Sequence, residues 1–179
     1  MKKETRTFRE YRYRPLLPHQ IRLLSFNTGS EELHIIHTDF NTAPSYTSVS
    51  YSWNDQQRDH DVHVDSHKLK IIDNLRIGLP YLIKRASTQF LWVDEICIDQ
   101  ENEAERVIQI PLMEEIYTRC QECLVWLGDG TPETDIAIDA IPRISEHVNL
   151  YATLESNLWK GLVNLLSRPW FTRVWTLQE

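Results

Sequence analysis

The sequence contains few glycines, few cysteines and no long apolar run, and each of these scarcities excludes a class of protein. Five glycines in 179 residues leave little room for a glycine-rich phosphate-binding loop, and the Gly-x-Ser-x-Gly motif of many serine hydrolases does not occur. No apolar stretch approaches the roughly 20 residues of a membrane-spanning helix, and the basic start lacks the apolar segment of a signal peptide. We therefore expect a cytoplasmic protein without a membrane span.

The few cysteines and the clustered histidines do not predict a metal site. Cys97, Cys120 and Cys123 are an odd number without framework spacing, which indicates reduced thiols. Cys120 and Cys123 have half of a zinc-ribbon spacing, but no second Cys-x-x-Cys accompanies them. The histidines of His60–His67 alternate with aspartates in a segment that we expect to be an exposed hairpin. Because no second ligand cluster is evident, no metal is predicted there.

The charge balance argues against nucleic acid as a partner. The chain has 26 acidic and 19 basic residues, a net charge of −7, whereas phosphate backbones attract clustered positive charge. Basic residues gather only within residues 1–20, which we expect to be a solvated arm. Six tryptophans and seven tyrosines indicate a folded domain with a substantial core.

Strands alternate with helices along the second half of the chain, which predicts an α/β fold. Short strands are expected at Ile21–Phe26, Leu33–His37, Ser48–Trp53, Asp61–Asp65, Lys68–Ile72, Leu91–Val93 and Cys123–Leu127. Helices are expected after a cap at Asp73 or Asn74, over Glu103–Cys120 with a kink at Pro111, from Pro132 until Pro142, over Leu154–Leu166, and from Pro169 through Trp175. The alternation favours a mainly parallel sheet with helices on both faces.

Polar side chains follow one of these apolar strands directly. Leu91–Val93 is followed by Asp94 and Glu95, and then by Asp99 and Gln100. In open α/β sheets, ligands bind beyond the carboxyl ends of the strands, so these side chains are candidates for a small-molecule site. A polar loop that only caps the next helix is the alternative, and this segment alone does not decide between them.

Two further clusters combine aromatic and polar residues. Trp53 follows a predicted strand and would stack on a flat ligand ring, while Ser52 and Asp55 would hydrogen-bond to sugar or amide groups. The alternative is an ordinary turn. Trp175 and Glu179 are four residues apart, so on a helix the ring lies beside the carboxylate and raises its pKa where water is excluded. The alternative is a buried tryptophan with a solvated glutamate.

Several of these blocks occur in an order that resembles a known family. The blocks are Tyr46–Trp53, Leu91–Gln100, Glu105–Arg106, Gln109, Met113, Ile116–Tyr117, Trp126–Gly128 and Arg168–Glu179, preceded by Tyr13–Leu16 and Ile21–Leu24. Together they resemble the heterokaryon incompatibility (HET) domain of filamentous fungi over nearly the whole chain. Asn54 departs from the glycine that is usual after the tryptophan, and Cys120 from a common alanine.

The resemblance implies one HET domain over residues 1–179, with a fold similar to the Toll/interleukin-1 receptor (TIR) domain. That fold is flavodoxin-like, with a mainly parallel sheet flanked by helices. Here it would carry an N-terminal β-rich extension, with residues 1–20 as its basic arm, and a helical insertion at residues 131–167. Since 48 positions separate Leu127 from Trp175, this insertion has to fold aside for Trp175–Glu179 to match the catalytic segment of TIR domains.

The resemblance also implies a role in non-self recognition that triggers cell death, through cleavage of NAD(P) at the nicotinamide N-glycosidic bond. Glu179 would be the catalytic carboxylate, with Trp53 and Trp175 as stacking walls and Ser52 and Asp94 as polar contacts. NAD or NADP would be the substrate, and no cofactor or metal is implied. The alternatives are a non-enzymatic module that acts by self-association, with a recognition protein as partner, and a domain that binds the nucleotide without cleaving it.

Overall fold

The computed structural model describes residues 8–27, 32–146 and 156–173, which group into two compact units. The described residues up to Trp126 belong to the first unit, and those from Leu127 to Arg173 belong to the second. Each unit is described by itself. Every helix in these ranges is too short or too polar to cross a lipid bilayer.

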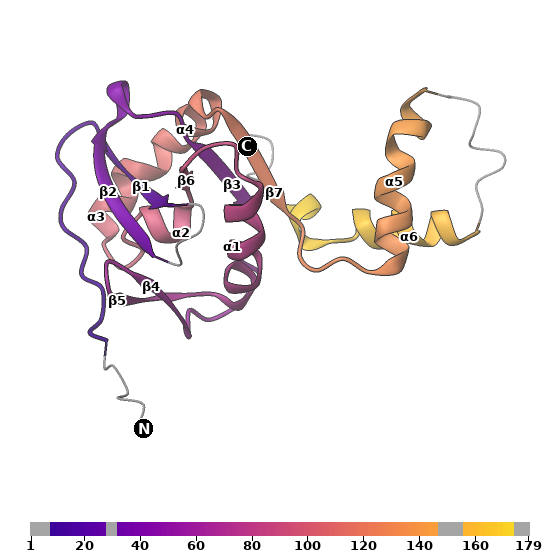
Figure 1. Cartoon of the computed structure of the whole chain (residues 1–179), viewed down its shortest axis with the longest axis horizontal. Coiled ribbons are helices and arrows are strands. Elements are labelled where there is room, and N and C mark those ends of the chain that lie inside the picture. The colour runs from indigo at the N-terminus through magenta and orange to yellow at the C-terminus, as the bar shows by residue number, and fades with distance from the viewer. Residues whose placement is uncertain (1–7, 28–31, 147–155, 174–179) are drawn as a thin grey trace. The chain divides into compact units, whose positions relative to one another are not determined.

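The first unit is built on one sheet, to which the described residues contribute seven strands (Figure 1). In chain order these are β1 (Gln20–Phe26), β2 (Leu33–Asp39), β3 (Thr47–Tyr51), β4 (His60–Val64), β5 (His67–Ile71), β6 (Phe90–Trp92) and β7 (Glu122–Trp126). Across the sheet they are ordered β5-β4-β2-β1-β6-β3-β7. Strands β6, β3 and β7 run parallel, whereas β1 is antiparallel to both β2 and β6, and β4 is antiparallel to β5.

The sheet is therefore mixed, and the expected mainly parallel sheet is corrected to a mixed sheet in an α/β fold, in which β2 and β4 also pair in parallel. The physical reason is local, because β1–β2 and β4–β5 are consecutive strands joined as antiparallel pairs. Asp65 and Ser66 form the two-residue connection of the second pair, both with positive φ, as tight hairpin turns require. The β4–β5 hairpin expected from the sequence is confirmed.

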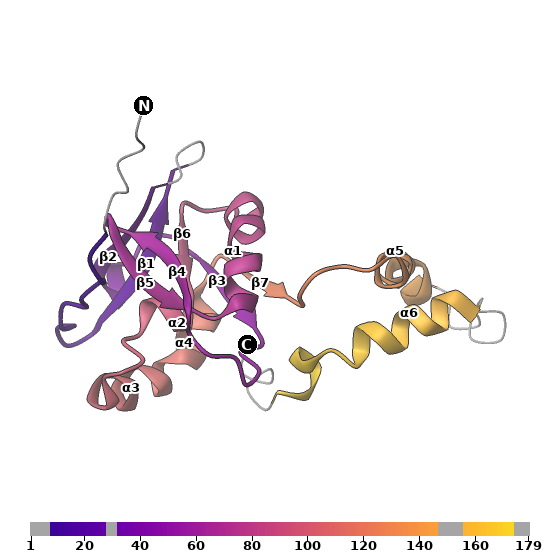
Figure 2. The same ribbon diagram turned by 90° about the horizontal axis from the view of Figure 1, so that it is seen from below.

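Helices lie on both faces of the central strands (Figure 2), and an apolar cluster is buried on each face there, which agrees with the continuous apolar runs in these strands. On one face, Leu75 and Leu79 of helix α1 (Asp73–Arg85) pack with side chains such as Leu24 and Val49 of the strands. On the other face, Ile116 and Tyr117 of helix α4 (Met113–Arg119) pack against strand side chains including Trp92. The expected helix layers on both faces are thus confirmed.

The segment after β6 forms a chain of short helices. Helix α2 (Asp94–Cys97) follows β6, and helix α3 (Glu103–Gln109) leads through a 3-10 turn, η2 (Ile110–Leu112), into α4. Pro111 lies in η2, so the predicted interruption at this proline is confirmed. Asn102 caps α3 by accepting a hydrogen bond from the Glu105 N–H at 3.2 Å.

Residues 9–13 of the N-terminal segment, which was expected to be a solvated arm, are docked through their backbone and tyrosines, while the arginines stay exposed. The Tyr11 N–H donates to the Lys68 carbonyl of β5 at 2.7 Å, and the Lys68 N–H donates to the Arg9 carbonyl at 2.8 Å. The Tyr13 hydroxyl donates to the Ile96 carbonyl at 2.9 Å. The tyrosines of this segment thus face the core, whereas Arg9 is exposed.

The second unit is a pair of packed helices, α5 (Pro132–Glu146) and α6 (Ser156–Leu166), followed by a 3-10 turn, η4 (Pro169–Thr172). The predicted helix start at Pro132 is confirmed. Pro142 lies inside α5, so the prediction that it ends the helix is wrong, because a proline removes one backbone bond without stopping every helix. A Cβ on Gly161 would collide with the Glu133 carbonyl, so α6 approaches α5 at a residue without a side chain.

Candidate functional site

The parallel strands bring three of the predicted site residues to one edge of the sheet. Ser52 and Trp53 follow β3, Asp94 follows the neighbouring strand β6, and β3 and β6 are paired in parallel. The indole N–H of Trp53 donates to Asp94 Oδ2 at 3.1 Å. Trp53 and Asp94 are both partly exposed, so this pair is accessible to a ligand. The carboxyl-edge rule correctly placed these side chains together.

Trp53 is held in a defined orientation. Its ring lies nearly parallel to that of Tyr51, with an interplanar angle of 25° and 6.5 Å between centroids. Asp94 is fixed in turn, because its Oδ1 accepts the Glu95 N–H at 2.8 Å and its carbonyl accepts the Gln100 amide at 2.8 Å. An oriented indole beside an oriented carboxylate is suited to stack a planar ring and to hydrogen-bond a hydroxyl.

Ser52 contributes to the site indirectly. Its hydroxyl donates to Asn54 Oδ1 at 2.6 Å, and its carbonyl accepts the Asn74 side-chain amide at 2.7 Å. The residue is only 7% exposed, so the structure places it in the loop network and not on an open surface. Asn54 has a φ of 49°, a left-handed conformation in which glycine carries no steric cost.

Asn74 is a residue whose role the sequence suggested incorrectly. It was expected, together with Asp73, as a possible helix cap, but the cap position of α1 is Ile72 and no side chain caps the helix there. Asn74 instead accepts the Trp126 indole N–H, at 3.0 Å through its side chain. Trp126 is the last residue of β7, so Asn74 links the ends of β3 and β7.

Glu95 is a buried carboxyl beneath this edge. Its side chain is fully buried and accepts the Tyr51 hydroxyl at 2.9 Å and the Ile72 N–H at 2.8 Å. Burial raises the pKa of Glu95 to about 7, although both hydrogen bonds oppose the shift. The sequence placed Glu95 at the strand end but gave no sign of its burial, because its partners come from distant segments.

A buried ion pair holds the loop that follows α2, and sequence reasoning missed it. Arg22 of β1 is fully buried and its two terminal nitrogens bond the Glu105 carboxylate at 2.5 and 3.0 Å. Glu105 also accepts the Asp99 N–H at 2.8 Å. Burial alone would raise the pKa of Glu105, but the Arg22 and Asp99 hydrogen bonds outweigh it, and the pKa is lowered. An arginine inside an apolar strand was the available sequence signal.

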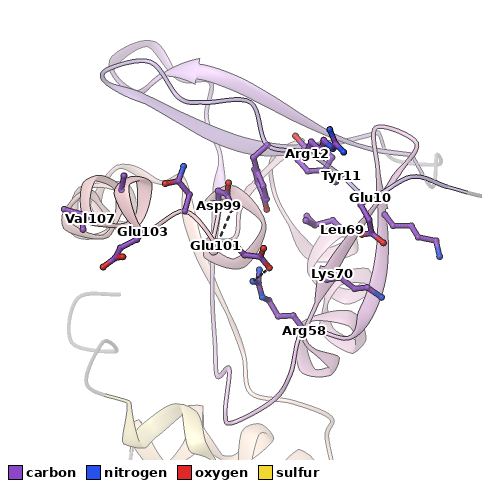
Figure 3. Close-up of a pocket in the computed structure, with 14 residues that line it drawn as sticks. Glu10, Tyr11, Arg12, Arg58, Leu69, Lys70, Asp99, Glu101, Glu103 and Val107 are labelled. Carbon is purple, nitrogen blue, oxygen red and sulfur yellow. Dashed lines mark hydrogen bonds and ion pairs between the residues drawn. The ribbon is translucent and has the colours of Figure 1, made fainter.

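Beside these loops lies a charged pocket of about 1070 Å³ (Figure 3). We call it the charged pocket; it is lined by Glu10–Tyr13, Arg58, Lys68–Lys70, Asp99 and Glu101–Ala104, together with Val107. Arg58 comes from the loop after β3, and Asp99 and Glu101 come from the loop after α2. The pocket therefore shares its loops with the carboxyl edge, although Trp53 and Asp94 do not line it.

The remaining predictions about this site concern thiols, metals and the C-terminal residues. Cys97, Cys120 and Cys123 are free thiols, and burial raises the pKa of Cys97 to about 12. In the part of the chain that the structure describes, no three His, Cys, Asp or Glu side chains come together as metal ligands. Trp175 and Glu179 lie outside the described residues.

Comparison with known proteins adds a family match. The sequence profile described as "Heterokaryon incompatibility protein (HET)" matches residues 46–179. The chain is similar to "Heterokaryon incompatibility protein 6, OR allele" of Neurospora crassa, with 24% identity over 212 residues that cover 89% of this chain and 31% of that protein. The chain thus spans about a third of the length of this relative. No solved structure matches it.

Proposed function

Because the chain belongs to the heterokaryon incompatibility (HET) family, we propose that it is an effector module of non-self recognition between fungal strains, which triggers cell death. The proposed activity is hydrolysis of NAD or NADP at the bond between nicotinamide and ribose. The observation that carries this proposal is the Trp53–Asp94 pair, an oriented ring and carboxylate at the carboxyl edge of two parallel strands.

The order of the parallel strands supports a TIR-like, flavodoxin-like core for this activity. Three adjacent strands run parallel: in chain order they are β3, β6 and β7, and across the sheet they lie as β6-β3-β7, so the first of them is central. The first three strands of flavodoxin-like folds have this order, and such folds bind nucleotides where the strand order reverses. Asn74, which links the ends of β3 and β7, lies at that reversal.

The chemistry requires little beyond a placed carboxylate and a ring-binding wall. Breaking the N-glycosidic bond passes through an oxocarbenium-like state, so a carboxylate near the ribose stabilises the developing positive charge. Water adds at the anomeric carbon, nicotinamide leaves with the bonding electron pair, and a proton and ADP-ribose (from NADP, its 2′-phosphate) are the other products. We assign the catalytic carboxylate to Glu179, ring stacking to Trp53 and Trp175, and a ribose hydrogen bond to Asp94.

The direct test measures nicotinamide released from NAD and from NADP by the purified chain, with chromatographic detection. Glu179→Gln is expected to lower turnover by about 10²–10⁴-fold, since a positioned acid–base group contributes that much. Glu115→Gln is a matched control, because Glu115 is an exposed carboxylate that pairs with Arg119 on α4. Equal turnover of the Glu179→Gln variant and the control would contradict the assignment of Glu179.

One observation favours the second candidate, a non-enzymatic module that acts by self-association and recruits a recognition protein. Helix α6 leaves Trp159, Val163 and Leu166 exposed along one side, at positions spaced four and three residues apart. An exposed apolar stripe of this kind is a common contact surface. Light scattering on the wild-type chain and on Val163→Lys tests it: a larger species that the substitution abolishes, without nicotinamide release, would support the second candidate.

A further inference from the structure

One wall of the charged pocket carries a net positive charge, because Arg12, Lys68 and Lys70 face the two carboxylates of Asp61 and Glu10. Lys68 and Lys70 of β5 share one carboxylate, Asp61, at 2.9 and 2.6 Å. Two ammonium groups on one carboxylate leave an excess positive charge, and their hydrogen bonds lower the pKa of Asp61 to about 2. Arg12 lines the same wall and forms no ion pair with any residue that the structure describes.

Arg58 is the cation best placed to contact a ligand in this pocket. Its side chain is 23% exposed and reaches Glu101 Oε1 at 3.3 Å (Figure 3). Glu101 is 86% exposed, so solvent screens this pair and little free energy holds the glutamate in place. A ligand with a stronger negative charge can therefore replace the Glu101 carboxylate on Arg58 without disturbing the fold.

The acidic side chains lie mainly on the opposite wall. Asp99 and Glu101 belong to the loop after α2, and Glu103 opens α3, whereas Glu10 lies with the basic residues (Figure 3). Asp99 is engaged locally, since its Oδ1 accepts the Glu101 N–H at 3.2 Å. Among the described residues, Glu101 is the acidic side chain that pairs with Arg58, so it is the group that competes directly with an anionic ligand.

We propose that the charged pocket binds the diphosphate group of a nucleotide, with Arg58 as the main phosphate contact and Glu101 as the carboxylate that the phosphate displaces. Planar guanidinium groups bind phosphate oxygens in pairs, and the excess charge of Lys68, Lys70 and Arg12 adds long-range attraction. The volume of about 1070 Å³ is sufficient for a nucleotide. The proposal rests on the proposed function only in the choice of a nicotinamide dinucleotide as the natural ligand.

The test is calorimetric titration of the full chain with ADP, ADP-ribose and adenosine at low salt. ADP and ADP-ribose are expected to bind, and adenosine, which lacks phosphate, is not. Arg58→Gln should weaken ADP binding at least tenfold, whereas Glu101→Gln should strengthen it about three- to tenfold by freeing Arg58. Arg76→Gln is the matched control, since Arg76 is an arginine on α1 that also pairs with a carboxylate, Asp73, and does not line the pocket.

The opposite signs of the two pocket variants make the proposal falsifiable even where one of them folds poorly. Absence of ADP binding, or a Glu101→Gln variant that binds ADP no more tightly than wild type, overturns it. Equal loss in Arg58→Gln and Arg76→Gln also overturns it. ADP binding without nicotinamide release would contradict only the proposed hydrolysis, and nicotinamide release without these binding effects would contradict only the phosphate site.

Discussion

Two buried glutamates of the first unit, ten positions apart, differ in the direction of their pKa shifts. Glu95, in α2, accepts hydrogen bonds from a neutral hydroxyl and a backbone N–H, and its pKa is raised to about 7. Glu105, in α3, contacts the Arg22 guanidinium, and its pKa is lowered. The comparison teaches that burial raises the pKa of both carboxyls, and that this rise is reversed only where a full opposite charge lies beside the carboxylate.

The difference matters because the two residues hold different parts of the candidate site. Glu95 connects the ends of β3 and β6 through Tyr51 and the start of α1 through Ile72. Glu105 fixes the loop that carries Asp99. One network can change protonation near neutral pH, whereas the other keeps its charges. Three substitutions test this contrast.

The largest expected effect follows from removing the arginine. Arg22→Met leaves the Glu105 carboxylate buried without its counter-charge, which should lower the free energy of unfolding by about 3–5 kcal/mol. Urea denaturation measures this change. Arg119→Met removes an exposed ion pair to Glu115 and should cost less than about 1 kcal/mol. A similar loss of free energy of unfolding in both variants would show that the buried ion pair stabilises the fold no more than the exposed one.

The second expected effect is a pH dependence that resides in Glu95. Because its pKa rises from 4.5 to about 7 on folding, the folded state binds a proton more readily between these values. Its contribution to the free energy of unfolding is therefore present below pH 4.5 and falls by about 3 kcal/mol as pH rises past 7. Urea titrations between pH 4.5 and 8 should show this fall in the wild type and not in Glu95→Gln.

Glu105 provides the opposite sign for the same experiment. Because folding lowers the pKa of Glu105, its contribution to the free energy of unfolding is fully present above its unfolded pKa. That contribution is lost as the pH falls through the lower pKa of the folded state. A Glu95→Gln variant that still loses stability between pH 5 and 8 would assign the effect to another group. The pH dependence of the free energy of unfolding thus distinguishes Glu95 from Glu105, while most hydrogen bonds of both networks stay in place.

The smallest expected effect comes from removing one neutral donor. Tyr51→Phe deletes the hydroxyl that donates to Glu95 Oε2 and should cost about 1–2 kcal/mol at pH 8, where the carboxylate is ionised. Since that hydrogen bond lowers the pKa of Glu95, the midpoint of the pH profile should move upward in the variant. An unchanged midpoint would show that the hydroxyl does not stabilise the ionised form.

The elements that could be predicted from the sequence are those set by local pattern. The β4–β5 hairpin, the interruption at Pro111 and the helix start at Pro132 follow from alternation, proline chemistry and capping, which depend on neighbouring residues. The antiparallel pairs β1–β2 and β4–β5 join consecutive strands, but that of β1 with β6 joins distant segments, and the sequence predicted more parallel pairing than exists.

The site was predictable where one topological rule applied. Ser52, Trp53 and Asp94 come together because the carboxyl ends of neighbouring parallel strands share an edge. Arg22 and Glu105 are 83 positions apart, so nothing in local spacing joins them. The predicted roles of Trp175 and Glu179 remain predictions, since these residues lie outside the described ranges.

The pairing of Arg9 and Tyr11 with Lys68 has a consequence for solubility. In the described sheet β5 is a terminal strand, and such strands offer free backbone groups on which another polypeptide can add. The two backbone hydrogen bonds that join the N-terminal segment to Lys68 occupy backbone groups on this side of β5. The N-terminal segment thereby covers the free side of β5, and deletion of residues 8–13 should promote aggregation by strand addition.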